Sequence, residues 1–195
     1  MGKTPSTTPD RRVGLLDAAL ANFVRFGFRK TSMDDVARDA GISRQALYAH
    51  FADKEELFRQ AMRHGLDVAM TAVDVALADE SVEMDVRLVR AVDAWLGRHL
   101  DRQGTDGSDL GEAARVLLGT LFADYGAIFV KKITRALAES PLAIVCKETK
   151  TTPQQFAETL LSCGLGWKHR ARSRAEFVAQ IEVAVRLMTP KARNR

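Results

Sequence analysis

The sequence predicts an all-α protein, and three observations carry this prediction. Apolar residues recur three or four positions apart along most of the 195-residue chain, which is the spacing of one helix face. Capping residues stand before these stretches, and Gly or Pro often stands after them. No stretch alternates apolar and polar residues as a half-buried strand does, and no segment repeats.

The chain begins with a polar segment and a first helix. Residues 1–9 are rich in Thr, Ser and Pro, so we expect a flexible tail there. Asp10 is the predicted N-cap of the first helix, and Gly27 is its predicted end, because glycine tolerates the left-handed conformation found at helix C-termini. The apolar face of this helix consists of Leu16, Ala19, Leu20, Phe23 and Val24.

Two short helices and the start of a long one follow. The second helix is predicted to begin at Thr31 or Ser32 and to end at Gly41. Ser43 is the expected cap of the third helix. The break formed by residues 40–43 has the composition of the tight turn between two crossed helices.

The fourth helix is predicted to be long. Asp53 and Glu56 have the spacing of a capping box at its start. The apolar pattern then continues to about Ala78, and Gly65 weakens this helix without ending it.

The remainder of the chain is also predicted to be helical. Thr152, Pro153 and Gln155 form a second helix-start pattern, with proline at the first helical position. The predicted elements are, in order, a helical stretch over 82–100, a loop over 103–111, a helical stretch over 113–137 that breaks near Gly119, an irregular segment over 140–152, a helix to about Lys168, and a last helix over 175–188 before Pro190.

Composition and charge narrow the class of protein. The chain is 46% hydrophobic, which is enough for a core, and its net charge of +4 favours polyanionic partners only mildly. Cys146 and Cys163 do not indicate a disulfide framework, so we expect both to be reduced. There is no signal-peptide core and no apolar run of about 20 residues, which predicts a soluble, cytoplasmic protein without a membrane partner.

The third helix carries the most informative surface. Leu47 and Phe51 supply its apolar side, so the long polar and aromatic side chains that alternate with them point away. A short helix with such an outer face, held by a preceding helix, is suited to enter the major groove of DNA.

These residues resemble the TetR family of transcriptional regulators. The likeness consists of the runs TSMDDVA (31–37), AGIS (40–43), LYAHF (47–51) and KEEL (54–57), and it covers about residues 10–66. It implies a three-helix helix-turn-helix domain over 10–54, an effector-binding and dimerisation domain over 55–190, and a tail over 191–195. A DNA-binding role by position is implied for Thr31, Ser32, Arg44, Gln45, Ala46, Tyr48, His50 and Lys54.

The resemblance also divides these roles. Arg44, Gln45 and Ala46 are the expected base readers, Ala46 at most through a thymine methyl group. Tyr48 and His50 are expected to contact phosphates or groove walls. The remaining three residues lie at helix N-termini, where phosphates bind.

Two further residue sets concern the C-terminal domain. Aromatic residues at helical spacing are either plain core or the lining of an effector cavity, and the methionines and leucine of the fourth helix could face the same space. This candidate ligand set is Met62, Leu66, Met70, Trp95, Phe122, Tyr125 and Phe129. The apolar stripes of the last two helices predict a four-helix dimer interface formed by Leu160, Leu161, Leu165, Phe177, Ile181, Val185 and Met188.

Other chemistry is not indicated. The histidines are scattered, so neither a metal nor another cofactor is expected. Ser162 and Cys163 lack a visible base partner, and no nucleophile, base and stabiliser converge, so an enzyme is not predicted. The basic segment 168–174 is either a solvated linker or a second nucleic-acid contact.

The combined prediction is a homodimeric, ligand-responsive repressor. It would bind double-stranded DNA at a near-palindromic operator and leave it when a small, largely apolar effector binds. The alternative is a constitutive DNA-binding factor on the same scaffold that organises chromosomes or takes part in division.

Overall fold

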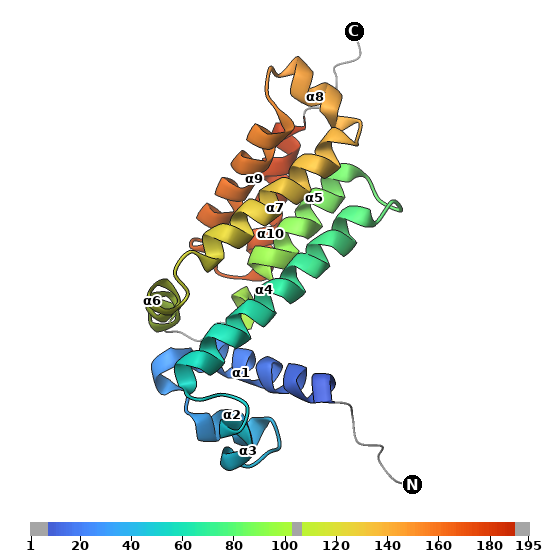
Figure 1. Cartoon of the computed structure of the whole chain (residues 1–195). Helices are drawn as coiled ribbons and strands as arrows, with labels where there is room; N and C mark the ends of the chain where they lie inside the picture. The colour runs from blue at the N-terminus through green and yellow to red at the C-terminus, as the bar shows by residue number, and fades with distance from the viewer. Residues whose placement is uncertain (1–7, 103–106, 190–195) are drawn as a thin grey trace. The chain divides into compact units, whose positions relative to one another are not determined.

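The computed structural model describes residues 8–102 and 107–189, and in this part of the chain it is all-α, as predicted (Figure 1). The helices are α1 (Thr8–Lys30), α2 (Met33–Asp39), α3 (Arg44–Tyr48), α4 (Lys54–Ala78), α5 (Met84–Val92), α6 (Gly107–Leu117), α7 (Leu121–Ala138), α8 (Leu142–Glu148), α9 (Pro153–Lys168) and α10 (Arg174–Met188). A π-helical turn, η1 (Asp93–Gly97), continues α5, and a 3₁₀ turn, η2 (Leu100–Arg102), follows.

The described chain packs as two compact units. The first unit comprises residues up to 67 together with 102–121, and the second comprises 68–101 and 122–189. The helix α4 runs without a break from one unit into the other, as the sequence predicted. The functional boundary predicted near residue 54 stays a prediction, and the packing units differ from it because α6 and the start of α4 belong to the first unit.

The core of the first unit forms around aromatic side chains from α1 and α4. The rings of Phe23 and Phe58 meet edge to face with centroids 5.0 Å apart, and Phe28 completes the cluster. Gly65 lets α4 approach α1 closely, since a Cβ there would lie 2.7 Å from the Leu20 side chain. The glycine that weakens α4 is therefore the point at which α1 crosses it.

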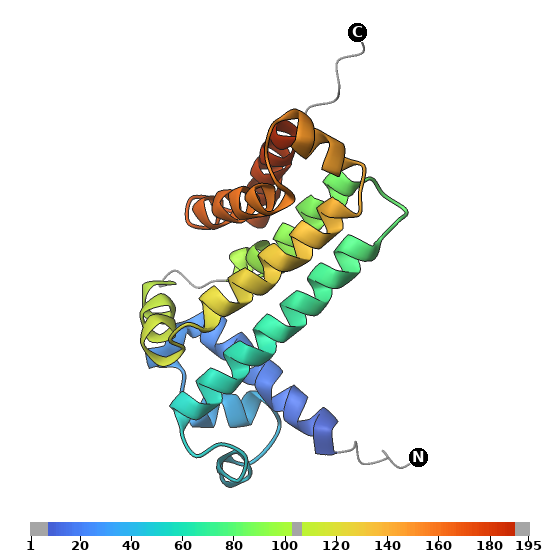
Figure 2. The same ribbon diagram turned by 45° about the horizontal axis from the view of Figure 1, so that its top comes forward.

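The second unit is a bundle of α5, α7, α9 and α10, to which the C-terminal part of α4 and the short α8 also belong. Figures 1 and 2 both show α9 beside α10 and α5 beside α7. A glycine again marks the closest packing, because a Cβ at Gly164 of α9 would lie 2.7 Å from Leu96 and 3.1 Å from Val92. The largest fully buried side chains of this unit are Leu88, Phe129, Ile133, Leu137, Leu160, Phe177 and Ile181.

Three predicted boundaries were wrong. The first helix already begins at Thr8, before the predicted N-cap Asp10. The rest of the predicted N-terminal tail and the predicted tail over 191–195 lie outside the described residues. The described part of the predicted loop over 103–111 is helical from Gly107. The segment after Ser140 is not irregular, because Pro141 caps α8 at a position where its missing N–H costs nothing and Cys146 is buried beneath it.

The predicted end of the first helix is a kink. Gly27 has φ +83° and ψ 173°, and one more helical turn follows it. The carboxylate of Asp109 on α6 accepts a hydrogen bond from the Arg29 backbone N–H at 2.7 Å and forms an ion pair with the Arg29 side chain at 3.2 Å. The glycine thus leaves room for a contact that ties α6 to the end of α1.

The predicted break near Gly119 is confirmed. Gly119 has φ +54° and separates α6 from α7. No single helix in the described chain is long and apolar enough to cross a bilayer, and α6 and α7 reach that length together only with a bend of 88° between them.

Candidate nucleic-acid interface

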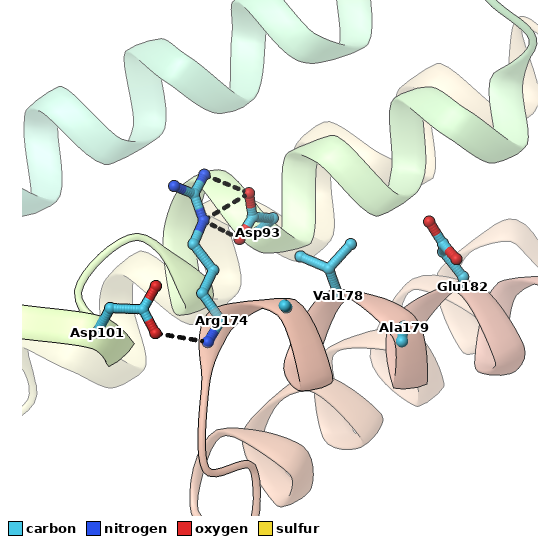
Figure 3. Close-up of a pocket in the computed structure, with 7 residues that line it drawn as sticks. Asp93, Asp101, Arg174, Val178, Ala179 and Glu182 are labelled. Carbon is cyan, nitrogen blue, oxygen red and sulfur yellow. Dashed lines mark hydrogen bonds and ion pairs between the residues drawn. The ribbon is translucent and has the colours of Figure 1, made fainter.

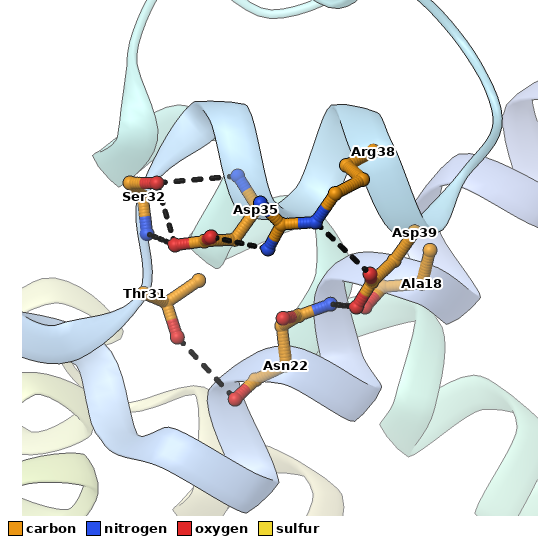
Figure 4. Close-up of polar contacts among 7 residues, drawn as sticks. All are labelled: Ala18, Asn22, Thr31, Ser32, Asp35, Arg38 and Asp39. Carbon is orange, nitrogen blue, oxygen red and sulfur yellow. Dashed lines mark hydrogen bonds and ion pairs between the residues drawn. The ribbon is translucent and has the colours of Figure 1, made fainter.

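The start of α2 is fixed by a reciprocal capping box (Figure 4). The Asp35 N–H donates to Ser32 Oγ at 3.2 Å, and the Asp35 carboxylate accepts from the Ser32 N–H at 3.2 Å and from its hydroxyl at 2.6 Å. These hydrogen bonds, together with Arg38, hold the pKa of Asp35 below its usual value. Ser32 is exposed at this helix end.

Thr31 is placed differently from Ser32. Its side chain is buried, and its hydroxyl donates to the Gly27 carbonyl oxygen at 2.7 Å. Asn22 lies beside it and donates to the Asp39 carboxylate of α2 at 2.9 Å (Figure 4). The Thr31 hydroxyl therefore fastens α2 to α1, and a phosphate contact by this side chain is not supported.

The turn between α2 and α3 needs a glycine. Gly41 has φ +67°, which side chains with a Cβ rarely adopt. The N–H of Ile42 reaches back to the Ala37 carbonyl oxygen at 3.0 Å, which closes the end of α2. Ser43 then caps α3 by accepting from the Ala46 N–H at 3.1 Å. Both helix starts predicted here are confirmed.

The outer face of α3 carries the expected readers. Leu47 is fully buried, whereas Arg44, Gln45 and Tyr48 are exposed. The Arg44 guanidinium lies 5.4 Å from the centre of the Tyr48 ring, so the two side chains cover each other. The segment presents them to solvent because one side of a five-residue helix must face the core.

Asp34 is the residue in this region that the sequence argument missed. Its carboxylate on α2 pairs with Arg44 on α3, with an oxygen-to-nitrogen distance of 2.7 Å. Hydrogen bonding to Tyr48 and the charge of Asp34 raise the pKa of Arg44 above its ordinary value. The signal was present in the sequence, because the Gly41 turn brings the first turns of both helices together.

Ala46 in the middle of α3 and His50 just after its end are both half-buried. The His50 ring lies beside Phe51, with centroids 6.3 Å apart. Lys54 at the start of α4 turns inward, where its ammonium donates to the Phe28 carbonyl oxygen at 3.1 Å and lies 4.4 Å from the Phe28 ring centre. An ammonium has three N–H donors, so this contact leaves others for a phosphate.

The start of α4 departs slightly from the predicted capping box. Asp53 accepts from the Glu56 N–H at 2.7 Å, as expected, but the Glu56 carboxylate reaches the N–H of Ala52 instead of that of Asp53. The helix start is fixed at the same place.

The candidate ligand residues are divided between the two units. The rings of Trp95 and Phe129 contact each other with centroids 4.8 Å apart, Tyr125 is buried, and Phe122 is partly exposed. Met62 and Leu66 belong to the first unit, while Met70 belongs to the second, and all three are buried. Their assignment to an effector site stays a prediction.

A shallow hollow lies elsewhere in the second unit, between the start of α10 and η1 (Figure 3). The Arg174 guanidinium binds both oxygens of Asp93, the shortest contact being 2.6 Å, and its backbone N–H donates to Asp101 at 2.8 Å. This ion pair raises the pKa of Arg174. Arg174 therefore links the start of α10 to η1 beside this hollow.

Most of the predicted dimer residues are internal. Leu160, Phe177, Ile181 and Val185 are buried within one copy of the chain, so they cannot form a contact with a second copy. Sequence periodicity identified the apolar stripes of α9 and α10 correctly but did not show which partner covers them. Among the predicted residues, Leu161 and Met188 are half-buried and Leu165 is exposed.

The residues of the basic segment 168–174 have different surroundings. Lys168 is largely buried, and burial lowers the pKa of its ammonium. The Arg170 guanidinium lies 5.1 Å from the Trp167 ring centre. In the described residues both cysteines are free thiols, and no group of three or more His, Cys, Asp or Glu side chains is placed to hold a metal ion.

A known protein family matches the N-terminal part of the chain. Residues 15–61 match the family described as bacterial regulatory proteins, tetR family. An uncharacterized HTH-type transcriptional regulator, YfiR, of Bacillus subtilis is 38% identical over 72 residues, which are 37% of this chain and 35% of that protein. The HTH-type transcriptional repressor KstR2 of Mycobacterium tuberculosis is 40% identical over 67 residues, 34% of each chain. The chain therefore spans about a third of the length of these relatives.

Solved structures share the fold over nearly the whole chain. A TetR transcriptional regulator from Legionella pneumophila has a TM-score of 0.69 at 15% identity and covers 96% of this chain and 100% of its own. A transcriptional regulator from Rhodococcus has a TM-score of 0.67 at 17% identity, with coverage of 93% and 96%.

The fold and the α2–α3 surface define an all-α helix-turn-helix protein. Residues 15–61 match the tetR family of bacterial regulatory proteins, and the whole described chain shares its fold with solved structures of such regulators.

Proposed function

We propose that the protein is a transcriptional regulator that binds double-stranded DNA through α3. The observation that carries this proposal is the outer face of α3, where Arg44, Gln45 and Tyr48 are exposed while Leu47 is buried. The caps at Ser32 and Ser43 hold α2 and α3 in place without help from a ligand.

The proposed contacts divide by chemistry. Arg44 and Gln45 read base edges, since a guanidinium can bind guanine O6 and N7 together and an amide can do the same with adenine. Ala46 offers only its methyl group. The polar side chains around this face, Ser32, Tyr48, His50 and Lys54, contact phosphates and groove walls. Thr31 is left out because its hydroxyl is engaged inside the first unit.

The protein acts as a homodimer in this proposal. Two copies of α3 would enter successive major grooves, about 34–36 Å apart, on a near-palindromic operator. The exposed apolar side chains of the last two helices replace the buried ones as the proposed contact, and they are Leu165, Val183 and Leu187, flanked by Leu161 and Met188.

Regulation by a small effector completes the proposal. The protein represses its targets until an effector binds in the second unit and favours a conformation that does not fit the operator. The helix α4 is the continuous element through which this change reaches the DNA-binding helices.

Genome-wide binding and one pair of variants test the function. We expect a few promoter sites, and an operator taken from one of them should lose about 5- to 150-fold in affinity in Arg44→Ala, because a good base contact is worth about 1–3 kcal/mol. Arg135→Ala is the control, since this arginine is exposed on α7 of the second unit and pairs there only with Glu139. Many dispersed sites would favour the chromosome-organising factor, and unchanged affinity in Arg44→Ala would remove the base-reading role.

A further inference from the structure

Arg98 follows η1 directly and is held there by its backbone. Its N–H donates to the Asp93 carbonyl oxygen five residues earlier, at 3.0 Å, which is the hydrogen bond of a π-helical turn. Such turns inside α-helices are frequent at functional sites.

The side chain of Arg98 is unusual. Its Nη1 atom is buried and has no hydrogen-bond partner within the residues that the structure describes. Two other buried side-chain atoms there share this condition, Asn22 Oδ1 and Thr134 Oγ1, and both belong to neutral groups. An unpaired buried donor costs free energy, and a charged one costs more than a neutral one.

Other arginines of the second unit have a carboxylate partner. Arg90 pairs with Asp79 at 2.6 Å, Arg135 pairs with Glu139 at 3.0 Å, and Arg174 pairs with Asp93. The side chains of these three arginines are about half exposed or more, so water can also solvate them. These three surface guanidiniums thus have carboxylate partners, whereas the buried Nη1 atom of Arg98 has none in the described chain.

An aromatic pair lies one helical turn before Arg98 along the chain. Trp95 stands three residues earlier and contacts Phe129 of α7. The Trp95 ring also lies against α7 one turn before Phe129, since a Cβ at Gly126 would lie 3.7 Å from it. Tyr125, the neighbour of Gly126 on α7, is buried.

We propose that Arg98 binds the anionic group of the effector and that Trp95, Tyr125 and Phe129 hold its apolar part. This inference rests on the proposed function, because it names the chemical class of the effector. An acid with an apolar body supplies the acceptor that Arg98 lacks, and the planar guanidinium suits the two oxygens of a carboxylate or the oxygens of a phosphate. The effector is then an amphiphilic acid instead of a largely apolar molecule.

Matched pairs of compounds test the charge requirement on the full-length protein. The probes are 3-phenylpropionate against its primary amide and hexanoate against hexanamide, with phenyl phosphate and inorganic phosphate to separate the two kinds of anion. We expect at least one organic acid to bind about tenfold or more tightly than its uncharged partner in calorimetry, and to raise the melting temperature. Equal binding within the pairs, or no binding by any of the organic anions, overturns the proposal.

Variants test the residue. Arg98→Met keeps the length of the side chain and removes the charge, so it should lose the preference for the acid, retain amide binding, and melt no lower than the parent without ligand. Arg135→Met should behave as the parent protein. If Arg98→Met does not fold, Arg98→Lys keeps the charge and loses the fork, and a reduced preference is expected. An unchanged acid preference, or loss of acid and amide binding alike, contradicts the role of Arg98.

DNA binding on the same preparations separates the two proposals. Acid binding that depends on Arg98 in a protein that binds no specific DNA would leave the anion site standing and remove the regulator. Operator binding that the bound acid does not change would show that the site does not hold an effector.

Discussion

The helix-turn-helix region and the inner helices of the second unit treat their polar groups in different ways. Side chains cap α2, α3 and the start of α4, at Ser32, Ser43 and Asp53. In the second unit Thr152 and Ser173 cap α9 and α10, but Glu83 makes no cap hydrogen bond at the start of α5, and Arg98 adds a buried donor without a partner among the described residues. Local hydrogen bonds therefore fix each helix start in the proposed DNA-reading region, whereas α5 in the second unit relies mainly on apolar packing.

Substitution of two neighbouring residues on α3 should have the largest effect, and it tests whether the core of the first unit holds this helix. Leu47→Ala should lower the free energy of unfolding by about 2–5 kcal/mol, because Leu47 is fully buried. Tyr48→Ala should change stability little and weaken DNA binding. Chemical denaturation and operator titration of both variants check this. Similar losses of stability in the two variants would mean that α3 is not held by the core as described.

Removal of caps compares capped helix starts in both units with the uncapped start of α5. Ser32→Ala and Thr152→Ala each break a reciprocal capping box, so each should cost about 0.5–2 kcal/mol. Glu83 makes no side-chain cap hydrogen bond, so Glu83→Ala should stay within about 0.5 kcal/mol of the parent. Denaturation midpoints decide the matter, and a large effect at Glu83 would contradict the contrast between capped and uncapped helix starts.

Low pH should weaken the capping box at the start of α2, and this is the smallest of the expected effects on stability. The pKa of Asp35 in the folded protein lies below the unfolded value of 3.8, so the folded state favours the carboxylate. Its contribution to stability is present above pH 3.8 and is lost as the pH falls through the folded pKa. Asp35→Asn should therefore lose less stability than the parent protein when the pH falls below about 4, as measured by denaturation curves. An identical acid profile in the variant would show that this capping box does not depend on charge.

The boundaries of α2, α3 and α9 were predictable because local chemistry decides them. Ser32, Ser43 and Thr152 each form their cap hydrogen bond within three residues, so no distant part of the chain needs to be known. The α8 segment was missed because its helix depends on the burial of Cys146, which periodicity over seven residues does not reveal.

The candidate site was predictable where local helix geometry decides which side chains are exposed. Exposure of Arg44, Gln45 and Tyr48 followed from the side of α3 that Leu47 occupies. The inward turn of Thr31 and Lys54 did not follow, because their partners, Gly27 and Phe28, lie at a kink of α1 that the sequence presented as a helix end. The burial of four of the predicted dimer residues did not follow either, since an apolar stripe does not say whether its partner belongs to the same copy.

The ion pair between Asp34 and Arg44 has a consequence for the search along DNA. A guanidinium that already has a carboxylate partner gains less from a single phosphate, and the carboxylate repels the phosphate backbone. Guanine offers two acceptors at once and can compensate for the lost partner. Binding to random sequence should therefore be weakened more than binding to the operator, so the protein spends less time on wrong sites before it reaches the right one.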